Sequence, residues 1–165
     1  MSDSQATSVH SSVVVDVPID RAFEVFTADM GSWWPVEHHI LEGELAEMVF
    51  EAREGGHVYD RGKDGSECHW ARVLAYEPPD RVVFTWDINL EWQLETDPDK
   101  TSEVEVRFVA ESPQRTRVTL EHRNIDRHGE GWQFLRDGVG SPEGWDLGLQ
   151  SFAARVEGSP IPNAS

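Results

Sequence analysis

The side chains in this sequence best suited to metal or proton chemistry are its histidines. His38 and His39 are neighbours in the segment GSWWPVEHHI, residues 31–40. Because adjacent side chains diverge from the backbone, the pair does not chelate one ion, and zinc would require further ligands. The available side chains lack paired ligand spacing; they are His57, His69, His122 and Cys68. We therefore expect no native metal site, and no motif indicates another cofactor.

His122 is the candidate for acid–base chemistry that the pattern places on an apolar face. It ends a run in which Val118 and Leu120 alternate with polar residues, as in a half-buried strand. An imidazole there could hydrogen-bond to a ligand or transfer a proton, or it could simply pair with a neighbour at the strand's end. Nucleophile elbows, phosphate loops and dinucleotide-binding fingerprints do not occur. The sequence therefore carries no strong catalytic signature.

The aromatic residues indicate packing or binding. Seven tryptophans are many for 165 residues, and each buried indole N–H needs a hydrogen-bond acceptor. Trp33 and Trp34 cannot both face one core from a regular strand, and Pro35 stops a helix there. This segment is open to three interpretations, namely core packing, a cover over a ligand, or half of a metal site.

Composition argues against several classes of partner. Thirty-one acidic residues against 14 basic ones give a net charge of -17, which repels nucleic-acid backbones and anionic membrane surfaces. Cys68 is the only cysteine, which excludes an intrachain disulfide and favours a reducing compartment. There is no signal-peptide pattern at the start and no apolar run of membrane-spanning length, so we expect a cytoplasmic protein.

Periodic patterns predict the elements that carry these residues. Ile19, Ala22, Phe23 and Phe26 form the apolar stripe of a short helix. Strands are predicted over residues 13–17, 45–53, 57–61, 67–76, 82–94, 103–108 and 117–122. The run 82–94 exceeds the usual strand length, so we expect a bend near Asn89. Short connections favour an antiparallel meander with one solvated face.

A second helix is predicted near the C-terminus, where it would cover the apolar face of the sheet. Ser141 suits its N-cap, Pro142 its first position and Gly158 its end. The apolar stripe between them consists of Trp145, Leu149, Phe152 and Val156. Gly144 and Gly148 are unfavourable in a helix, so we expect open space or a close backbone approach beside them.

This order of elements resembles the helix-grip fold of the START-like, or SRPBCC, superfamily. Local segments sharpen the resemblance to bacterial proteins of the activator of heat-shock protein 90 ATPase homologue-like family; they are VFTADMGSWWP, EGGHVYDR, WARVLAYEPPDRVVFTW, EVEVRF and TRVTLEHRN. The similarity extends from about Val13 to Val156. It implies an α+β fold in which a curved antiparallel sheet of six to seven strands wraps around a long C-terminal helix, with short helices after the first strand.

The resemblance also implies the domain organisation. We expect a flexible N-terminus over residues 1–8, a single START-like domain over 9–158 and a flexible tail over 159–165. The segment 138–142, which contains two glycines and a proline, interrupts what is often one long helix in relatives. A short helix over 131–136 should therefore precede the main one. The eukaryotic co-chaperone has a separate N-terminal domain that holds much of its chaperone contact, and nothing like it precedes Val13.

In the helix-grip fold, the sheet and the helix leave a mostly apolar cavity, which suits an apolar ligand held by a few polar groups. The segment with Trp33 and Trp34 lies over one mouth of that cavity, so one indole should fill the core beside Phe23 and Phe26 while the other covers the cavity. The residues expected to bind the ligand are Trp33, Trp34, Trp86, Trp92, His122, Trp145, Leu149 and Phe152. Asp87 and Glu91, on the opposite face of their strand, are poor catalytic candidates.

Three functions follow from the resemblance, and the sequence leaves them open. The first is non-catalytic binding of a small hydrophobic ligand, most simply an aromatic one. The second is a cyclase- or aromatase-like enzyme that uses the same cavity, with His122 near Trp86 or Tyr59 as its polar set. The third is a co-chaperone-type interaction with a protein partner, for which the acidic surface is suited. We expect no nucleic-acid or membrane partner, and either a monomer or a homodimer.

Overall fold

The computed structural model describes residues 7–34, 44–90, 93–141 and 144–157. Several predictions made from the sequence concern residues outside these ranges. They concern the tail over 159–165, most of the N-terminal segment 1–8, the pair His38 and His39, the helix start at Pro142, and Trp92.

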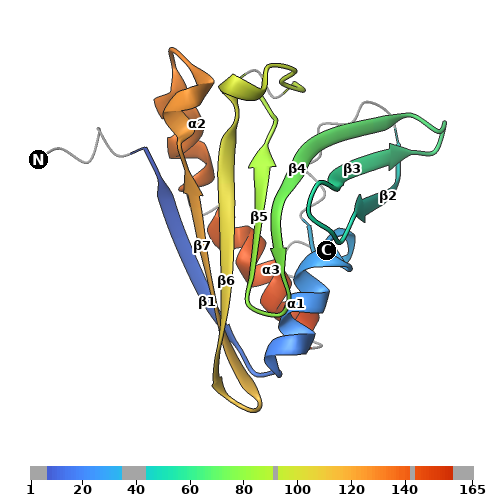
Figure 1. The fold of residues 1–165 in the computed structure, drawn as a ribbon, viewed down its shortest axis with the longest axis vertical. Helices are drawn as coiled ribbons and strands as arrows, with labels where there is room; N and C mark the ends of the chain where they lie inside the picture. The colour runs from blue at the N-terminus through green and yellow to red at the C-terminus, as the bar shows by residue number, and fades with distance from the viewer. Residues whose placement is uncertain (1–6, 35–43, 91–92, 142–143, 158–165) are drawn as a thin grey trace, which may run out of the picture.

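One antiparallel sheet of seven strands forms the body of the described chain. Its strand order is β1-β7-β6-β5-β4-β3-β2, so the sheet is a meander whose first strand has joined the far edge. The strands are β1 (Val9–Val15), β2 (Leu45–Phe50), β3 (His57–Gly62), β4 (Glu67–Glu77), β5 (Arg81–Trp86), β6 (Ser102–Ser112) and β7 (Arg115–Arg123). The sheet curls into a half-barrel (Figure 1), which confirms the predicted α+β helix-grip architecture.

Bulges on the long strand β4 account for part of this curl. Val58 pairs with Ala71 whereas the next residue, Tyr59, pairs with His69, so Trp70 is an extra residue on β4. A second shift on the same strand leaves Leu74 without a partner across β5. Each extra residue increases the local twist and bends the strand. The bend turns the half of the sheet that contains β2 and β3 toward the helices.

The prediction of one long strand over 82–94 is wrong in its second half. Strand β5 ends at Trp86, and the chain then reverses, so that Ile88 forms an isolated antiparallel bridge with Leu94. Asn89 closes this reversal, because its backbone N–H donates to the carbonyl of Gln93 at 2.7 Å while its side chain accepts from the Gln93 N–H at 2.9 Å. Asparagine favours such turns by bonding to nearby backbone. The predicted bend was therefore a full turn.

The helices are α1 (Ile19–Thr27), α2 (Trp132–Val139) and α3 (Trp145–Glu157), with short 3₁₀ turns η2 (Met30–Ser32), η4 (Pro98–Lys100) and η5 (Ile125–His128). The short helix predicted over 131–136 is α2. The main helix begins at Trp145 and not beside Ser141, because the Ser141 hydroxyl donates to the Gly138 carbonyl at 2.8 Å and so closes α2. No helix in the described ranges is long and apolar enough to cross a membrane.

Helix α3 packs on the concave side of the sheet, behind the central strands in Figure 1. Its predicted stripe of Trp145, Leu149, Phe152 and Val156 is buried. Both ends of the helix are hydrogen-bonded to the edge strand β1 or to the residue that follows it. Near its start, Asp146 accepts a hydrogen bond from the Ser11 hydroxyl at 2.5 Å, and at its end Glu157 accepts from the Asp16 backbone N–H at 2.9 Å.

The two glycines near the start of α3 differ in their surroundings. A Cβ added at Gly144 would lie 2.2 Å from the carbonyl oxygen of Val139, whereas one added at Gly148 would meet nothing closer than Trp145 Cε3 at 3.8 Å. A close backbone approach therefore explains Gly144, as predicted, but does not explain Gly148.

We expect Gly144→Ala to lower the free energy of unfolding by about 1–3 kcal/mol, since its methyl group would push α2 and α3 apart. Gly148→Ala is the matched control and should instead raise it by up to about 1 kcal/mol through helix propensity. Urea denaturation of both variants measures these changes. Equal effects of the two substitutions would contradict the close approach at Gly144.

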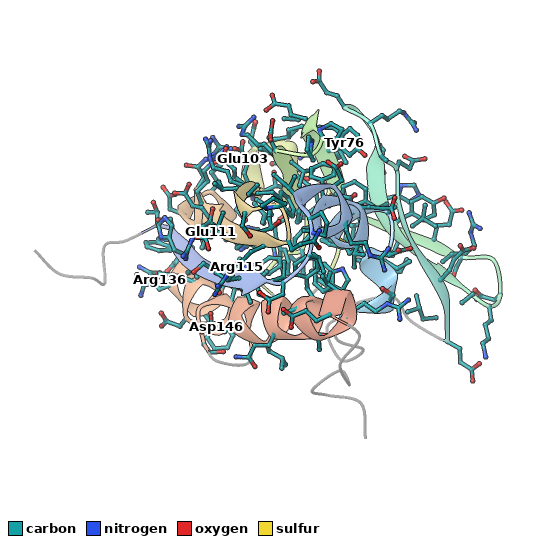
Figure 2. All side chains as sticks on the ribbon, turned by 90° about the horizontal axis from the view of Figure 1, so that it is seen from below. Tyr76, Glu103, Glu111, Arg115, Arg136 and Asp146 are labelled. Atoms are coloured by element: carbon teal, nitrogen blue, oxygen red, sulfur yellow. The ribbon has the colours of Figure 1, made fainter. Side chains whose placement is uncertain are left out.

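The convex face of the sheet carries a network of ion pairs centred on Glu105. Its carboxylate, on β6, contacts Arg81, Arg107 at 3.1 Å and Arg123 at 3.0 Å. Glu103, seen on the outside of the molecule in Figure 2, joins the network through the same Arg123, at 3.1 Å. Burial raises the pKa of the Glu105 carboxyl, but the hydrogen bond from Arg81 and the three guanidinium charges outweigh it, so that this pKa lies below its ordinary value.

Glu105→Gln should destabilise the fold at neutral pH by about 1.5–3 kcal/mol, the usual range for a charged hydrogen bond lost inside a network. A lowered pKa means that the carboxylate stabilises the fold above its ordinary pKa and stops doing so as the pH falls through the folded-state value. The difference between wild type and variant should therefore shrink below about pH 4.5. Glu77→Gln, which removes an exposed partner of Arg81, is the control and should cost less than about 1 kcal/mol.

Candidate ligand-binding site

Four indoles meet between the sheet and the start of α3, and we call Trp34, Trp70, Trp86 and Trp145 the indole cluster. They come from four separate segments, namely the second residue after η2, the bulge on β4, the end of β5 and the first turn of α3. Their ring centroids form a closed circuit, with Trp34–Trp70 at 5.2 Å, Trp70–Trp86 at 5.9 Å, Trp86–Trp145 at 5.6 Å and Trp145–Trp34 at 5.7 Å. No member is more than 6% exposed.

The adjacent tryptophans Trp33 and Trp34 have different environments. Trp33 packs against Phe26 at 4.9 Å and Phe152 at 5.5 Å, and its indole N–H donates to the Val25 carbonyl at 3.0 Å. It therefore fills the core behind α1 with its polar atom satisfied. Trp34, whose ring also contacts that of Trp33 at 5.7 Å, belongs to the indole cluster. A 3₁₀ turn, in which residues need not alternate as in a strand, allows this division.

A chain of buried polar side chains adjoins the indole cluster, and we call Trp145, His122, Ser102 and His128 the polar chain. The Trp145 indole N–H donates to His122 Nδ1 at 3.1 Å. His122 Nε2 lies 2.6 Å from the Ser102 hydroxyl oxygen, which in turn lies 2.8 Å from His128 Nε2. The chain thus links α3 to β7, then to β6 and finally to η5.

Burial keeps His122 uncharged. The side chain has no exposed surface, and desolvation, helped by the nearby His128, lowers the His122 pKa to about 3. Desolvation also lowers the pKa of His128, although the carboxylates of Glu95 and Asp87 partly oppose this. Near neutral pH the His122 ring is neutral, and both of its nitrogens have partners within the protein.

Two nitrogen atoms of the indole cluster and the polar chain lack a hydrogen-bond partner in the part of the protein that the structure describes. They are the Trp86 indole N–H and the Nδ1 position of His128, and both atoms are buried. The two side chains are 4% and 7% exposed, respectively. Buried polar atoms are nearly always paired, so exceptions of this kind indicate a missing partner.

The remaining predicted residues do not all converge here. Leu149 and Phe152 are buried on α3, but Phe152 contacts Phe26 and Trp33 in the core beneath α1. Tyr59 stacks on His69 at 4.3 Å on the β3–β4 part of the sheet, which separates it from the polar chain around His122. Asp87 is held by Arg72 at 3.0 Å. Among the described residues, no group of three histidine, cysteine or carboxylate side chains could hold a metal ion.

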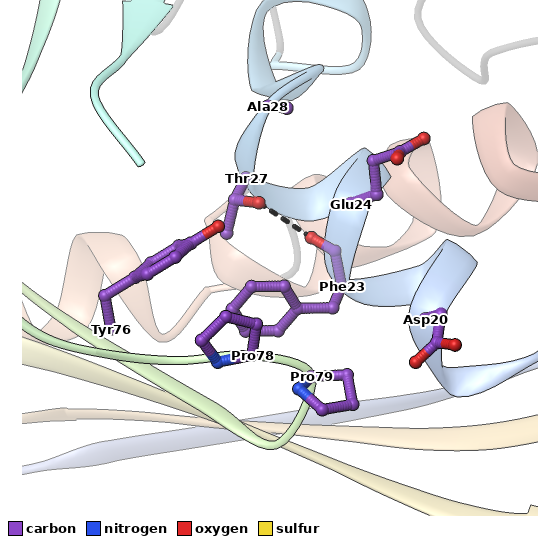
Figure 3. A pocket seen from close by; sticks show the side chains of 8 residues that line it. All are labelled: Asp20, Phe23, Glu24, Thr27, Ala28, Tyr76, Pro78 and Pro79. Atoms are coloured by element: carbon purple, nitrogen blue, oxygen red, sulfur yellow. Dashed lines mark hydrogen bonds between the residues drawn. The ribbon is translucent and has the colours of Figure 1, made fainter. Parts of the chain in front are cut away.

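A separate hollow of about 380 Å³ lies at the other end of β5, between α1 and the β4–β5 turn (Figure 3). Asp20 and Glu24 stand on its α1 side, and Tyr76, Pro78 and Pro79 form the facing wall. Thr27 does not offer its hydroxyl proton to this hollow, because it donates to the Phe23 carbonyl at 2.8 Å. The hollow shares no lining residue with the indole cluster.

Comparison with known proteins gives the family. Residues 16–157 match the family model described as Activator of Hsp90 ATPase homolog 1-like protein. The chain belongs to this family. No curated protein sequence matches the chain.

Solved structures of similar proteins include two with functional names. A structure of an anthrahydroquino-γ-pyrone synthase, determined as a complex, is 37% identical, with 94% of this chain and 99% of that chain covered and a TM-score of 0.64. The self-sacrificing resistance protein CalC from Micromonospora echinospora is 29% identical, with coverages of 94% and 97% and a TM-score of 0.66. A protein from Nitrosomonas europaea, 14% identical with coverages of 96% and 97% and a TM-score of 0.65, shares the fold.

His122→Phe should destabilise the protein at pH 7 by about 1–3 kcal/mol, because it leaves the buried Trp145 indole N–H without its acceptor, whereas the Ser102 hydroxyl keeps its contact with His128. The pH dependence has a defined sign. Because the folded-state pKa is lowered from 6.5 to about 3, the unfolded chain binds a proton more readily, and wild-type stability falls as the pH drops between these values.

This loss should amount to about 1.4 kcal/mol per pH unit below pH 6. The variant lacks the titrating imidazole, so the difference in free energy of unfolding between wild type and His122→Phe should be smaller at pH 5 than at pH 7. Chemical denaturation at both pH values measures it. A gap that stays constant would show that His122 is not held neutral by the fold.

Proposed function

We propose that this protein binds a small planar aromatic molecule at the indole cluster, between the sheet and the first turns of α3. The observation that carries the proposal is the convergence of four indoles from four segments, one of which, Trp86, has a buried N–H without an acceptor among the described residues. Packing alone would favour aliphatic and phenyl side chains, since an unpaired buried N–H costs free energy. A ligand that stacks on the rings and accepts from that N–H would offset the cost.

The geometry of the rings supports a flat ligand. The neighbouring indoles meet at centroid distances of 5.2–5.9 Å and at interplanar angles from 35° to 78°. A flat aromatic ligand could meet these rings in the same offset or edge-to-face arrangements that they make with one another. The 37% identical structure supports the same class of ligand, because its name refers to a fused aromatic compound.

Ring closure on such a molecule is the second candidate function. It is favoured by the whole-chain similarity to the anthrahydroquino-γ-pyrone synthase. His122 is not assigned as a catalytic residue, because both of its ring nitrogens are hydrogen-bonded within the protein, to Trp145 and to Ser102. Incubation with an uncyclised anthrahydroquinone precursor, followed by mass spectrometry, would separate an enzyme from a binder. The third hypothesis, a co-chaperone role, rests on the family description alone.

Equilibrium dialysis with 1,8-dihydroxyanthraquinone tests the proposal. We expect saturable binding to the wild type and about tenfold weaker binding to Trp34→Leu, a loss of about 1.4 kcal/mol, because this ring contacts two members of the indole cluster and has a stacking role. Trp132→Leu is the matched control, since this indole packs under the Arg136 guanidinium on α2. Absence of saturable binding, or equal loss in both variants, would overturn the proposed site.

A further inference from the structure

The direction of every hydrogen bond in the polar chain follows from its first member. An indole N–H only donates, so His122 Nδ1 must be the acceptor in the Trp145 contact. A neutral imidazole that accepts at Nδ1 carries its proton at Nε2. His122 therefore donates to the Ser102 oxygen, 2.6 Å away.

Ser102 passes this direction on to His128. Its side chain has no exposed surface, and its two hydrogen-bonding neighbours among the described residues are the histidines. Because His122 already donates to it, the serine hydroxyl can give its own proton only to His128 Nε2. A neutral His128 that accepts at Nε2 carries its proton at Nδ1, and Nδ1 is the buried atom without a described partner.

A second unpaired donor lies at the same end of the sheet. Trp86 and Ser102 are directly opposite one another in the β5–β6 ladder, and Ser102 contacts His128 at 2.8 Å. The Trp86 indole also packs against the His122 ring at 5.2 Å. The indole cluster and the polar chain thus each contain one buried nitrogen without a partner among the described residues, and Ser102 neighbours both of these residues.

We infer that the Trp86 Nε1–H and the His128 Nδ1–H together form the polar subsite for the ligand, and that this subsite selects an uncharged aromatic molecule with a carbonyl oxygen on its buried edge. The inference rests on the proposed function and specifies its ligand. A carbonyl oxygen has two lone pairs and can accept a hydrogen bond at each, whereas the N–H of an amine or amide would meet a donor and not an acceptor at either nitrogen.

Charge around the subsite favours a neutral oxygen over an ionised one. The carboxylates of Asp87 and Glu95 lie close enough to His128 to affect its titration, and the protein carries a net charge of -17. The Arg72 guanidinium pairs with Asp87 and so does not serve an anion at the subsite. A phenolate or carboxylate would have to be desolvated beside these negative groups, which a ketone or quinone oxygen avoids.

The test compares two planar tricyclic compounds that differ only at one position, 9-fluorenone with a carbonyl and fluorene with a methylene. Equilibrium dialysis against the wild-type protein should give a dissociation constant about tenfold lower for fluorenone, as expected when two buried donors gain an acceptor. Equal affinity for the two compounds would overturn this inference while leaving the proposed function intact. Binding of neither compound would overturn both.

Variants then locate the discrimination. His128→Phe keeps a ring of similar size and should reduce the preference for fluorenone over fluorene to about twofold or less. Ser102→Ala removes the group that sets the His128 proton and should reduce the preference partly. His10→Phe, the same substitution at an exposed position on β1, should leave the preference unchanged. An undiminished preference in a folded His128→Phe protein would show that the carbonyl is recognised elsewhere.

Discussion

The structure depends on one hydrogen bond between two buried rings, the contact from the Trp145 indole N–H to His122 Nδ1. It joins the first residue of α3 to the end of β7, at a point where both rings are buried. The indole N–H can only donate, and burial keeps the imidazole neutral, so His122 accepts at Nδ1 and carries its proton at Nε2. His122 therefore donates to Ser102, and Ser102 donates to His128. A buried neutral network of this kind defines a unique arrangement, since every member must be satisfied in turn.

In the proposed ligand site, the aromatic and polar parts have complementary roles. The indole cluster provides apolar surface, which favours binding of any flat apolar molecule but discriminates poorly among such molecules. The two unpaired donors provide the discrimination, because a molecule that lacks an acceptor leaves them unsatisfied. Of the two adjacent tryptophans, one contributes to the stability of the fold and the other to the proposed site. Trp33 stabilises the core under α1, and Trp34 is available to the site.

Much of the fold was predictable from periodic patterns, and the failures have local causes. Alternation identified the sheet and the inward face that carries Trp86 and His122, because one buried face imposes a period of two. Alternation cannot detect a reversal of the chain, which is why the strand predicted over 82–94 ends at Trp86. A bulge likewise hid Trp70, since an extra residue changes which side chains face inward.

The polar end of the site was harder to predict. His128 lies in no periodic segment, and it reaches Ser102 because Asn124 adopts a left-handed conformation, with φ of 59°, and turns the chain back after β7. Asparagine tolerates that conformation better than most residues, but nothing in the sequence specifies where the turned segment packs. Ser102 gave no signal because a strand-end serine is ordinarily solvated. The family resemblance predicted the architecture, whereas the order of hydrogen bonds became clear only from the contacts in the structure.

The most direct measurement of the central claim is ¹⁵N NMR of the histidine ring nitrogens at neutral pH in the ligand-free protein. The hydrogen-bond order from Trp145 to His128 predicts two neutral imidazoles of opposite tautomer, with His122 protonated at Nε2 and His128 protonated at Nδ1. A free neutral histidine has no such enforced assignment. Spectra in which His128 carries its proton at Nε2, or in which either ring is charged, would contradict the hydrogen-bond order described above.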